Sequence, residues 1–401
     1  MQRKLVVIAH VPNEAVTDGF VPAGKALEYD VILITDHALE YGIFFKRKLD
    51  TAPSSIFECD VFNPIAIIDL LHAHGIVPDV VFSNSDHLQS ASALVAEYFR
   101  LPGKQWSTCY RAKNKAAMRQ YLELLGLPTT WSQLLQAGAE LPRDINYPVI
   151  AKPCEGVASI DVSLCYNHQE LEDYCRLFFR KNAGAAILLE GFLEGTLLTL
   201  ETLGDGKCIQ AVGGFDVALS EPPYFVELEA QWNGEESVKW REEALAQIEK
   251  FGVGFGVCHS EFIATEKGPI LVEINYRSIG DGREFLLNKL LAFNWFETII
   301  RLHAGQPLNE FPHSDSDAII RYIAATSSGC VDNISNDLSR EGDGVKLSFR
   351  KLKQAGDLIQ ISHSNKDYLG IVTGISSNTH KLKLSEEVDN FTQQLTWEVR
   401  K

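Results

Sequence analysis

The stretches Ser260-Glu261-Phe262-Ile263-Ala264 and Ile270-Leu271-Val272-Glu273-Ile274-Asn275-Tyr276-Arg277 decide the fold prediction. Each mixes apolar and polar residues at strand spacing, and a short turn separates them, which indicates two antiparallel strands. Because alternate side chains of a strand share a face, Glu273 and Asn275 point the same way, and Glu261 can lie beside them. Two carboxylates and an amide oxygen are hard ligands of the kind that Mg²⁺ prefers, so the sequence predicts a metal face.

Arg277 lies two residues beyond Asn275, on the same face if the strand continues. A guanidinium there is suited to hold a transferring phosphoryl group or a developing oxyanion. The alternative is a half-exposed strand whose polar residues merely face solvent. Apolar residues between the polar ones, and polar groups that converge from two strands, favour the metal face. The neighbouring His259 is interpreted as a packing residue that faces away from it.

Two lysines occupy positions where an anionic partner is expected. Lys152 ends the apolar run Val149-Ile150-Ala151 and precedes a loop that contains Ser159. A lysine in a strand destined for the core needs an anion, and a phosphate over the loop would supply one. Lys115 opens a helix expected over 114–125, where backbone donors and the helix dipole favour an anion. For Lys115 alone, an exposed helix residue is the simpler alternative.

The first hundred residues alternate continuous apolar runs with amphipathic segments. Strands are expected at 4–9, 29–34 and 78–83, and helices at 63–71 and 87–99. This alternation is typical of a parallel sheet covered on both faces, a Rossmann-like arrangement. No G-x-G-x-x-G motif follows the first strand, which argues against a dinucleotide site.

The segment Ser83-Asn84-Ser85-Asp86-His87 contains serine, histidine and aspartate side chains. N-capping of the next helix by Ser85 or Asp86 explains it more simply than hydrolytic catalysis. Because the segment follows a parallel strand, it can also line a substrate cleft at the carboxyl edge of the sheet.

Composition limits the classes of function. The chain has 401 residues, 45% hydrophobic and 22% charged, so two or three domains with sizeable cores are expected. A formal charge of −16 argues against a nucleic-acid or membrane-surface partner. No apolar run approaches membrane-spanning length, no signal peptide is apparent, and the eight cysteines include no C-x-x-C pair. A cytoplasmic protein with reduced cysteines is expected.

Four separated blocks, in their order along the chain, resemble the ATP-grasp superfamily. They are Asn114-Lys115…Met118-Arg119, YPVIAKP at 147–153, LEGFLEG at 189–195, and Glu261…Glu273-x-Asn275-x-Arg277. Within the superfamily the chain is most similar to carboxylate–amine ligases of the amino-acid ligase type, a likeness that extends to 222–227 and 367–372.

This resemblance implies an α/β and α+β multidomain fold. A Rossmann-like N-terminal domain (pre-ATP-grasp domain) is expected over 1–107. An ATP-grasp core follows over 108–310, with a small lid subdomain at about 147–190, and a C-terminal α+β region covers 311–401. Residues 310–317 are the expected linker.

The resemblance also implies roles for single residues around the phosphates. Lys115 and Lys152 would contact the phosphates of ATP, and Ser159 would lie in the loop that covers them. This chain has Ala158 and Asp161 where relatives often have glycine, so a stiffer or differently shaped loop is expected.

A second set of residues would surround adenine and ribose. Glu190, Phe192 and Leu193 would form the hinge strand against adenine, with Glu190 accepting a hydrogen bond from the exocyclic amine or lying beside the residue that does. Many relatives have a ribose-binding Glu where this chain has Leu197, and Glu201 is expected to take part of that role.

At the metal end, Glu261, Glu273 and Asn275 would hold Mg²⁺, with Mn²⁺ as an alternative ion. Arg277 would serve the acyl-phosphate and tetrahedral states. The expected function is therefore the ATP-dependent joining of a small carboxylate to an amine through an acyl phosphate, in the synthesis of a small metabolite such as a dipeptide or siderophore.

Two other functions stay open at this point. One is a carboxylase-like ATP-grasp enzyme that activates bicarbonate. The other is a regulatory protein that binds a nucleotide without turnover. Small-molecule carboxylate and amine substrates are the expected partners, and a homodimer is a further expectation from the resemblance.

Overall fold

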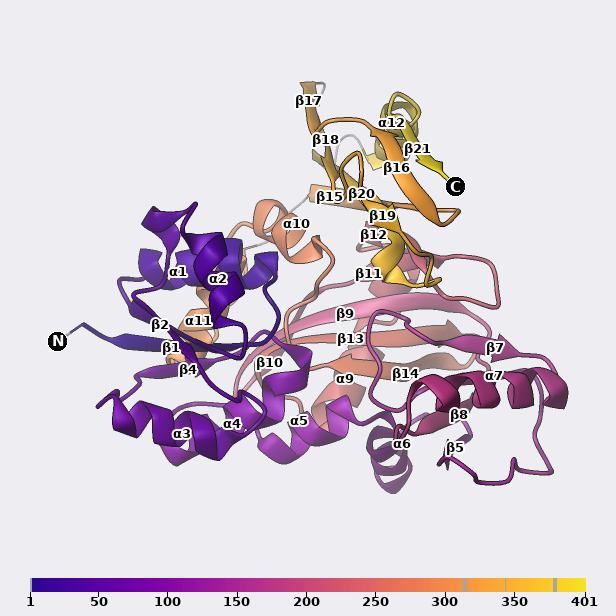
Figure 1. Cartoon of the computed structure of the whole chain (residues 1–401), viewed down its shortest axis with the longest axis horizontal. Coiled ribbons are helices and arrows are strands. Elements are labelled where there is room, and N and C mark those ends of the chain that lie inside the picture. The colour runs from indigo at the N-terminus through magenta and orange to yellow at the C-terminus, as the bar shows by residue number, and fades with distance from the viewer. Residues whose placement is uncertain (1, 313–315, 343, 378–380) are drawn as a thin grey trace.

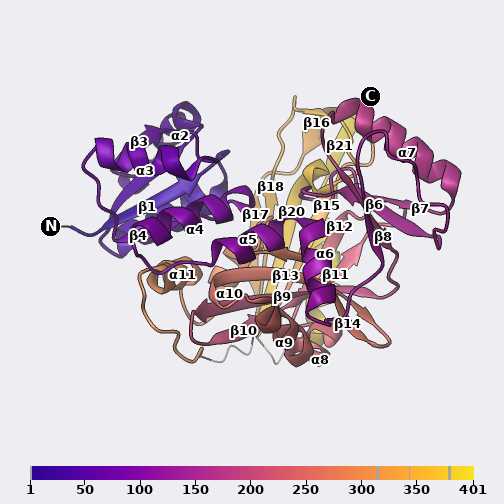
Figure 2. The same ribbon diagram turned by 90° about the horizontal axis from the view of Figure 1, so that it is seen from below.

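The computed structural model describes residues 2–312, 316–342, 344–377 and 381–401, whose strands form four sheets (Figure 1). Residues 313–315 of the expected linker lie outside this description. The N-terminal sheet and a small lid sheet stand on opposite sides of a large central sheet, as Figure 2 shows from below. The mixture of parallel and antiparallel sheets in several parts confirms the predicted multidomain α/β and α+β class.

The N-terminal sheet is parallel and has the strand order β3-β2-β1-β4. Its strands are β1 (Lys4–Ala9), β2 (Asp30–Thr35), β3 (Ser55–Glu58) and β4 (Val80–Phe82). The helices around it are η1 (Ala15–Phe20), α1 (Val21–Ala26), α2 (Ala38–Phe45), η2 (Leu49–Thr51), α3 (Pro64–Ala73), η3 (Asp86–Leu88) and α4 (Gln89–Tyr98). The three predicted strands and both predicted helices are present, whereas β3 and the helices before it escaped prediction.

The continuous apolar run of β1 has a simple cause, because both of its faces are buried. Leu5 and Val7 join the core under α1 and α11 (Trp295–His303), whereas Val6 and Ile8 join a separate core under α3 and α4. A strand that is covered on both sides has no solvent face on which polar residues could alternate.

The lid is a four-stranded sheet that follows α5 (Trp106–Lys113) and α6 (Lys115–Leu124). Its order is β5-β8-β6-β7, and α7 (His168–Lys181) covers it. The strands are β5 (Ser132–Leu135), β6 (Val149–Pro153), β7 (Ser163–Cys165) and β8 (Ile187–Gly191). The apolar runs predicted β6 and β8, but β5 and β7 are too short to leave a periodic signal.

The central sheet has the order β14-β13-β9-β11-β12-β15-β20-β18-β17, with β10 also paired to β9. Its strands are β9 (Thr196–Asp205), β10 (Ile209–Gly213), β11 (Phe215–Leu219), β12 (Glu227–Trp232), β13 (Phe255–Thr265), β14 (Gly268–Asn275), β15 (Ser316–Ala324), β17 (Leu338–Gly342), β18 (Val345–Lys351) and β20 (Tyr368–Ser377). Strands from residue 316 onward therefore extend the same sheet as β13 and β14, which carry the predicted metal ligands.

The remaining elements flank this sheet. They are α8 (Glu235–Lys239), α9 (Arg241–Phe251), α10 (Arg283–Leu290), η4 (Asn365–Asp367), α12 (Lys381–Thr392) and a third small sheet of β16 (Gly329–Ile334), β19 (Leu358–Ile359) and β21 (Trp397–Arg400). Across the described ranges, no helix combines the length and the apolar character needed to cross a membrane. All eight cysteines fall within these ranges, and each is free.

Candidate active site

The predicted pair of strands is present, and its register brings the two carboxylates together. β13 and β14 are antiparallel, with Glu261 directly opposite Glu273 and His259 opposite Asn275. A β-bulge follows Glu261. The two carboxylate side chains keep 21% and 24% of their surface exposed, whereas Asn275 is buried. The pair is thus open to an ion while it is fixed on rigid strands.

Asn275 and Arg277 lie next to each other on this face, although the strand that was expected to align them ends at Asn275. β14 ends at Asn275, yet Arg277 stays beside it, because its Nη2 donates to Asn275 Oδ1 at 3.3 Å. The Asn275 amide nitrogen, rather than its oxygen, points to Glu261 Oε1 at 3.5 Å. Coordination of an ion beside Glu261 by the amide oxygen therefore requires this amide to rotate.

The interpretation of His259 as a residue that faces away from the metal face is wrong. It lies two residues before Glu261 and so shares its face of β13. Its Nδ1 is 2.7 Å from Glu201 Oε1, and its Nε2 is 3.2 Å from Glu261 Oε1. Burial would lower the pKa of His259, but the two carboxylates raise it to about 9. The buried His259 ring thus lies on the same strand face as Glu261 and bridges it to Glu201.

The same contact keeps Glu201 out of the lining of the cavity that the other predicted nucleotide residues share. Its side chain is fully buried, and its Oε1 accepts from Thr199 Oγ1 at 3.0 Å and contacts His259. The cavity wall at the expected ribose position is Leu197, without a carboxylate. The sequence could not show that Glu201 already has a partner on the neighbouring strand.

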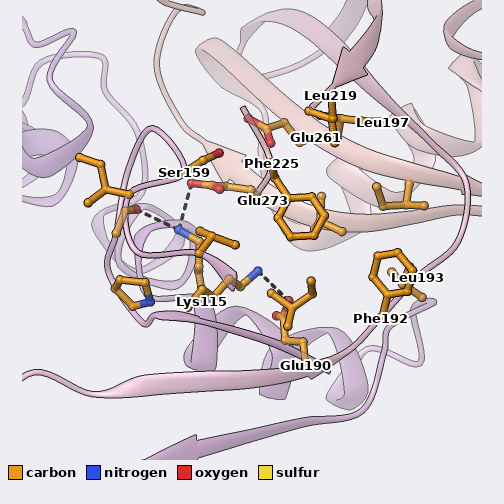
Figure 3. A pocket seen from close by; sticks show the side chains of 18 of the residues that line it. Lys115, Ser159, Glu190, Phe192, Leu193, Leu197, Leu219, Phe225, Glu261 and Glu273 are labelled. Atoms are coloured by element: carbon orange, nitrogen blue, oxygen red, sulfur yellow. Dashed lines mark hydrogen bonds and ion pairs between the residues drawn. The ribbon is translucent and has the colours of Figure 1, made fainter. Parts of the chain in front are cut away.

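A narrow cavity of about 160 Å³ lies between the lid and the central sheet (Figure 3). Its lining includes Lys115, Ile150, Lys152, Val157, Ser159, Glu190, Phe192, Leu193, Leu197, Leu219, Phe225, Glu227, Glu261, Val272 and Glu273. Every residue implied to bind a nucleotide except Glu201 is present. Figure 3 shows Phe192 and Leu193 on one side and Lys115 and Ser159 on the other, so the cavity has an apolar side and a charged side.

The two lysines connect the lid to the metal face. Lys115 donates to the carbonyl of Gly156 at 3.0 Å and to Glu273 Oε1 at 3.0 Å. Burial lowers the pKa of Lys152, and its ion pair with Glu190 at 2.6 Å only partly opposes this. Burial would likewise lower the pKa of Lys115, but Glu273 raises it above its ordinary value.

Arg119 belongs to the first of the four sequence blocks and contacts Glu190, a contact that the sequence did not predict. Its side chain is fully buried, its Nε pairs with Glu190 Oε1 at 2.6 Å, and its Nη1 donates to the carbonyl of Leu271 at 2.6 Å. Burial would raise the pKa of Glu190, but Lys152 and Arg119 lower it to about 2. The i, i+4 spacing of Lys115 and Arg119 on one helix face was the available signal.

Both carboxylate oxygens of Glu190 already form ion pairs, one with Arg119 and the other with Lys152. These ion pairs affect the hydrogen bond that Glu190 was expected to accept from adenine. An exocyclic amine would compete with Arg119 and Lys152 for those oxygens. This placement favours the second expectation, that Glu190 lies beside the group which accepts from adenine.

The glycine-poor loop over the narrow cavity adopts the backbone that glycine favours. Ala158, Ser159 and Asp161 all have φ of 55°, a left-handed conformation that costs an L-residue about 1–2 kcal/mol. The carbonyl of Ala158 accepts from the backbone amide of Asn365 at 3.2 Å. A contact with the C-terminal region thus helps to hold the loop in this shape.

A wide cavity of about 700 Å³ also opens at Glu261 and Glu273. Loops of three regions line it, and the lining includes His10, Asn13, Glu14, Asn84, Asp86, His87, Glu227, Glu261, Glu273, Asn275, Arg277, Asp281, Arg283, Glu284, Arg350, Lys353, Asn365 and Lys366. Val157, Ser159, Glu227, Glu261 and Glu273 line both cavities. The two cavities therefore meet at the metal face.

The segment 83–87 lines the wide cavity at residues 84–87, as its position after a parallel strand predicted. Asn84 Oδ1 accepts from the backbone amide of Ser278 at 3.1 Å. Ser85 is the N-cap residue of η3, as predicted, but its side chain makes no capping hydrogen bond to that helix. The Asp86 carboxylate forms an ion pair with Lys113 instead.

Charge pairs across this cavity join regions that are distant in sequence, and no local sequence pattern indicates them. Arg283 pairs with Glu227 at 2.6 Å, and Asn365 Nδ2 donates to the other oxygen of Glu227 at 3.1 Å. Arg350 donates to Glu14 at 2.6 Å, which links the C-terminal region to the N-terminal domain.

Comparisons with known proteins agree with this architecture. The structure of an L-amino acid ligase from Bacillus licheniformis matches with a TM-score of 0.79 and 19% identity over 100% of this chain and 99% of that chain. Phosphoribosylglycinamide synthetase from Anaerococcus prevotii matches with a TM-score of 0.70 and 14% identity over 100% of both chains. Biotin carboxylase from Campylobacter jejuni gives 0.68 and 15%, over 98% of this chain and 92% of that chain.

Two curated proteins are similar to the chain in sequence, at 24% and 21% identity. The uncharacterized protein y4rH of Sinorhizobium fredii is 24% identical over 348 residues, which are 83% of this chain and 70% of that protein. The C-terminal section of the carbamoyl phosphate synthase large chain of Aquifex aeolicus is 21% identical over 67% of this chain, which spans about half (53%) of that protein. No family model matches the sequence. The shared architecture over the whole chain shows that the protein has the fold of the ATP-grasp superfamily.

Proposed function

We propose that the chain is an ATP-dependent ligase that joins a small carboxylate to an amine through an acyl phosphate and releases ADP and phosphate. The observation that carries this proposal is the meeting of two cavities at one metal face. Glu261 and Glu273 line both the narrow and the wide cavity. A phosphoryl group held from one side would thus be open to an organic substrate from the other.

The narrow cavity has the chemistry that ATP requires. Phe192 and Leu193 offer apolar surface for a base, while Lys115, Lys152 and the Ser159 loop provide cationic and polar groups for phosphates. A solved relative of the same fold supports nucleotide use: the biotin carboxylase domain of the Hydrogenobacter thermophilus 2-oxoglutarate carboxylase, 17% identical with a TM-score of 0.64, was crystallised with MgADP and bicarbonate.

The donor set fits a hard divalent ion. Glu261 and Glu273 face each other on paired strands with part of their surface exposed, and Asn275 adds an amide beside them. These residues would hold Mg²⁺ or Mn²⁺, which neutralises phosphate charge when bound. Because Lys115 contacts Glu273, a positive charge of the chain would lie beside phosphates bound at this ion.

The proposed reaction needs positioning and charge neutralisation, without a protein nucleophile. A carboxylate oxygen of the first substrate attacks the γ-phosphorus of ATP, the bond to ADP breaks, and an acyl phosphate forms. The amine of the second substrate then attacks the acyl carbon, a C–N bond forms, and phosphate leaves with the bridging oxygen. Arg277 lies beside the metal face, where its guanidinium would stabilise the tetrahedral oxyanion.

The test is ADP formation from ATP with a panel of amino-acid pairs, followed by mass spectrometry of the products. Glu273→Gln is expected to lower the rate at least 100-fold, whereas Glu266→Gln, at the exposed turn of the same hairpin, is expected to leave it unchanged. Equal turnover of wild type and Glu273→Gln would refute the proposal. ADP release with bicarbonate alone, without any amine, would favour the carboxylase alternative instead.

A further inference from the structure

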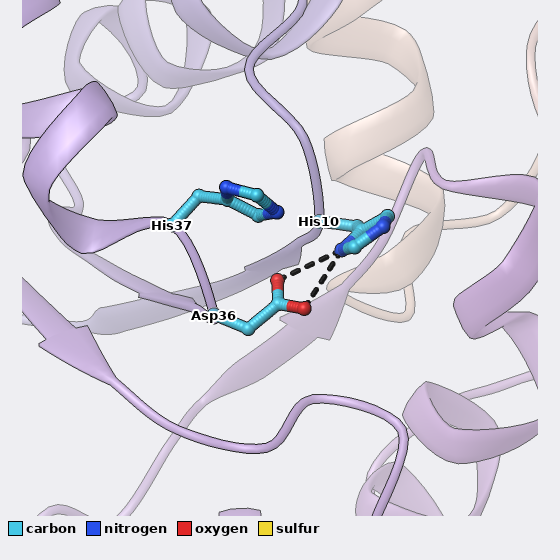
Figure 4. A group of neighbouring side chains, drawn as sticks. All are labelled: His10, Asp36 and His37. Carbon is cyan, nitrogen blue, oxygen red and sulfur yellow. Dashed lines mark hydrogen bonds and ion pairs between the residues drawn. The ribbon is translucent and has the colours of Figure 1, made fainter.

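A second group of metal-ligating side chains lies in the N-terminal domain, away from the predicted metal face. His10 directly follows β1, and Asp36 and His37 directly follow β2 (Figure 4). The two strands are parallel, and Ala9 is in register with Thr35, so the next residues emerge side by side. The carboxyl edge of the sheet therefore brings two imidazoles and a carboxylate to one point, as Figure 4 shows.

The distances between these groups suit a single ion. One ligand atom from each side chain lies within 4.8 Å of the other two. His10 Nδ1 is 2.8 Å and 2.9 Å from the two oxygens of Asp36, and the two imidazole centroids are 5.0 Å apart. With metal–ligand bonds of about 2.0–2.2 Å, ligand atoms of one tetrahedral ion lie about 3.3 Å apart, and two bound imidazole centroids lie about 5 Å apart.

Two further observations point to a built site. His37 Nδ1 faces Glu40 Oε1 at 3.6 Å, and a metal-binding histidine commonly presents its other ring nitrogen to a carboxylate. Thr35 Oγ1 donates to the carbonyl of His10 at 3.3 Å and accepts from the backbone amide of His37 at 3.1 Å, which ties the two ligand loops together. The ligand side chains remain 27–31% exposed, so an ion can enter.

We propose that His10, Asp36 and His37 bind one divalent transition-metal ion of the Zn²⁺ and Co²⁺ class. Two imidazole nitrogens and one carboxylate are a ligand set that such ions prefer, whereas Mg²⁺ prefers oxygen ligands. The site is therefore chemically distinct from the face of Glu261 and Glu273. Because His10 also lines the wide cavity, a bound ion would fix part of that cavity wall and leave a coordination position for water.

Cobalt binding to the whole chain tests this assignment. The protein is stripped with a chelator, millimolar Mg²⁺ is added to occupy oxygen sites, and Co²⁺ is titrated while the visible absorption of nitrogen-coordinated Co²⁺ is followed. Wild type and Glu273→Gln are both expected to bind one equivalent. His37→Gln and Asp36→Asn are expected to weaken binding at least tenfold, and Zn²⁺ is expected to displace the cobalt and remove the absorption.

His72→Gln is the matched control, because His72 is an exposed histidine of the same domain whose ring contacts Tyr98 and Phe99. It is expected to bind Co²⁺ like wild type, and circular dichroism checks that all variants are folded. The proposal is overturned if wild type gives no such absorption, which would leave His10 and Asp36 as a plain hydrogen-bonded pair. It is also overturned if Glu273→Gln abolishes the signal and His37→Gln does not.

Discussion

The narrow and wide cavities share the metal face but are built in opposite ways. The narrow cavity is lined mainly by side chains of lid and central strands, with Lys115 from α6 and loop residues such as Ser159 and Phe192. Several of these residues lie in the continuous motifs 147–153 and 189–195. The wide cavity is assembled from loops of the N-terminal domain, the end of β14, and the C-terminal region. Rigid elements thus hold the part that the reaction type requires, and loops hold the part that would select the organic substrates.

The two cavities also differ in how their charges are balanced. In the narrow cavity Glu190 is buried and clamped by Arg119 and Lys152. In the wide cavity Arg350 pairs with Glu14 across two regions, and both side chains are more than a third exposed. Substitution of the buried Glu190 group should therefore affect folding as well as binding, whereas substitution of the exposed Arg350 should affect substrate recognition with little effect on folding.

The largest effect on stability is expected from a substitution in the buried clamp, the group formed by Glu190 with Arg119 and Lys152. Arg119→Leu leaves the buried Glu190 carboxylate with one cation fewer and should destabilise the chain by about 3–5 kcal/mol. Arg301→Leu is the control, because Arg301 forms an exposed i, i+4 pair with Glu297 that should contribute about 0.5 kcal/mol or less. Urea denaturation of both variants measures the difference, and equal midpoints would contradict a buried clamp.

Acid should weaken the same clamp. The folded-state pKa of Glu190 is lowered from 4.5 to about 2, although burial alone would raise it. Its contribution is therefore complete above pH 4.5 and is lost as the pH falls toward 2, a loss of at most about 3 kcal/mol. The stability gap between wild type and Glu190→Gln should shrink over this range, and a gap that stays constant with pH would count against the ion pair.

A smaller and more selective effect is expected in the wide cavity. Arg350→Ala should raise the KM of one organic substrate about tenfold, or about 1.4 kcal/mol, and leave the KM of ATP unchanged. Arg340→Ala is the matched control, since Arg340 forms an exposed pair with Glu387 outside the lining of either cavity. Steady-state kinetics of both variants measures the two KM values. An equal rise in the KM of ATP for Arg350→Ala would contradict separate binding of ATP and the organic substrate in the two cavities.

The sequence predicted what depends on local periodicity. Alternation placed Glu261 beside Glu273, and apolar runs predicted β1, β2, β6 and β8. The same alternation puts His259 on the face of Glu261, so its position was predictable from the sequence. Local patterns, in contrast, carry no information about which distant groups meet.

Three features depended on such distant contacts. Glu201 contacts His259 because β9 pairs with β13 and places the two residues opposite each other. Arg119 meets Glu190 across 71 positions. The strands after residue 316 extend the central sheet through the pairing of β12 with β15. Pairings across such separations are set by tertiary packing, which no periodic pattern records.

One isotope experiment tests the acyl phosphate most directly. A substrate carboxylate identified in the amino-acid panel is labelled with ¹⁸O, and the phosphate released during ligation is analysed by mass spectrometry. If a carboxylate oxygen attacks the γ-phosphorus and the amine later displaces phosphate, each phosphate should carry one ¹⁸O from the substrate. Unlabelled phosphate formed together with ligated product would contradict activation of the carboxylate by phosphorylation.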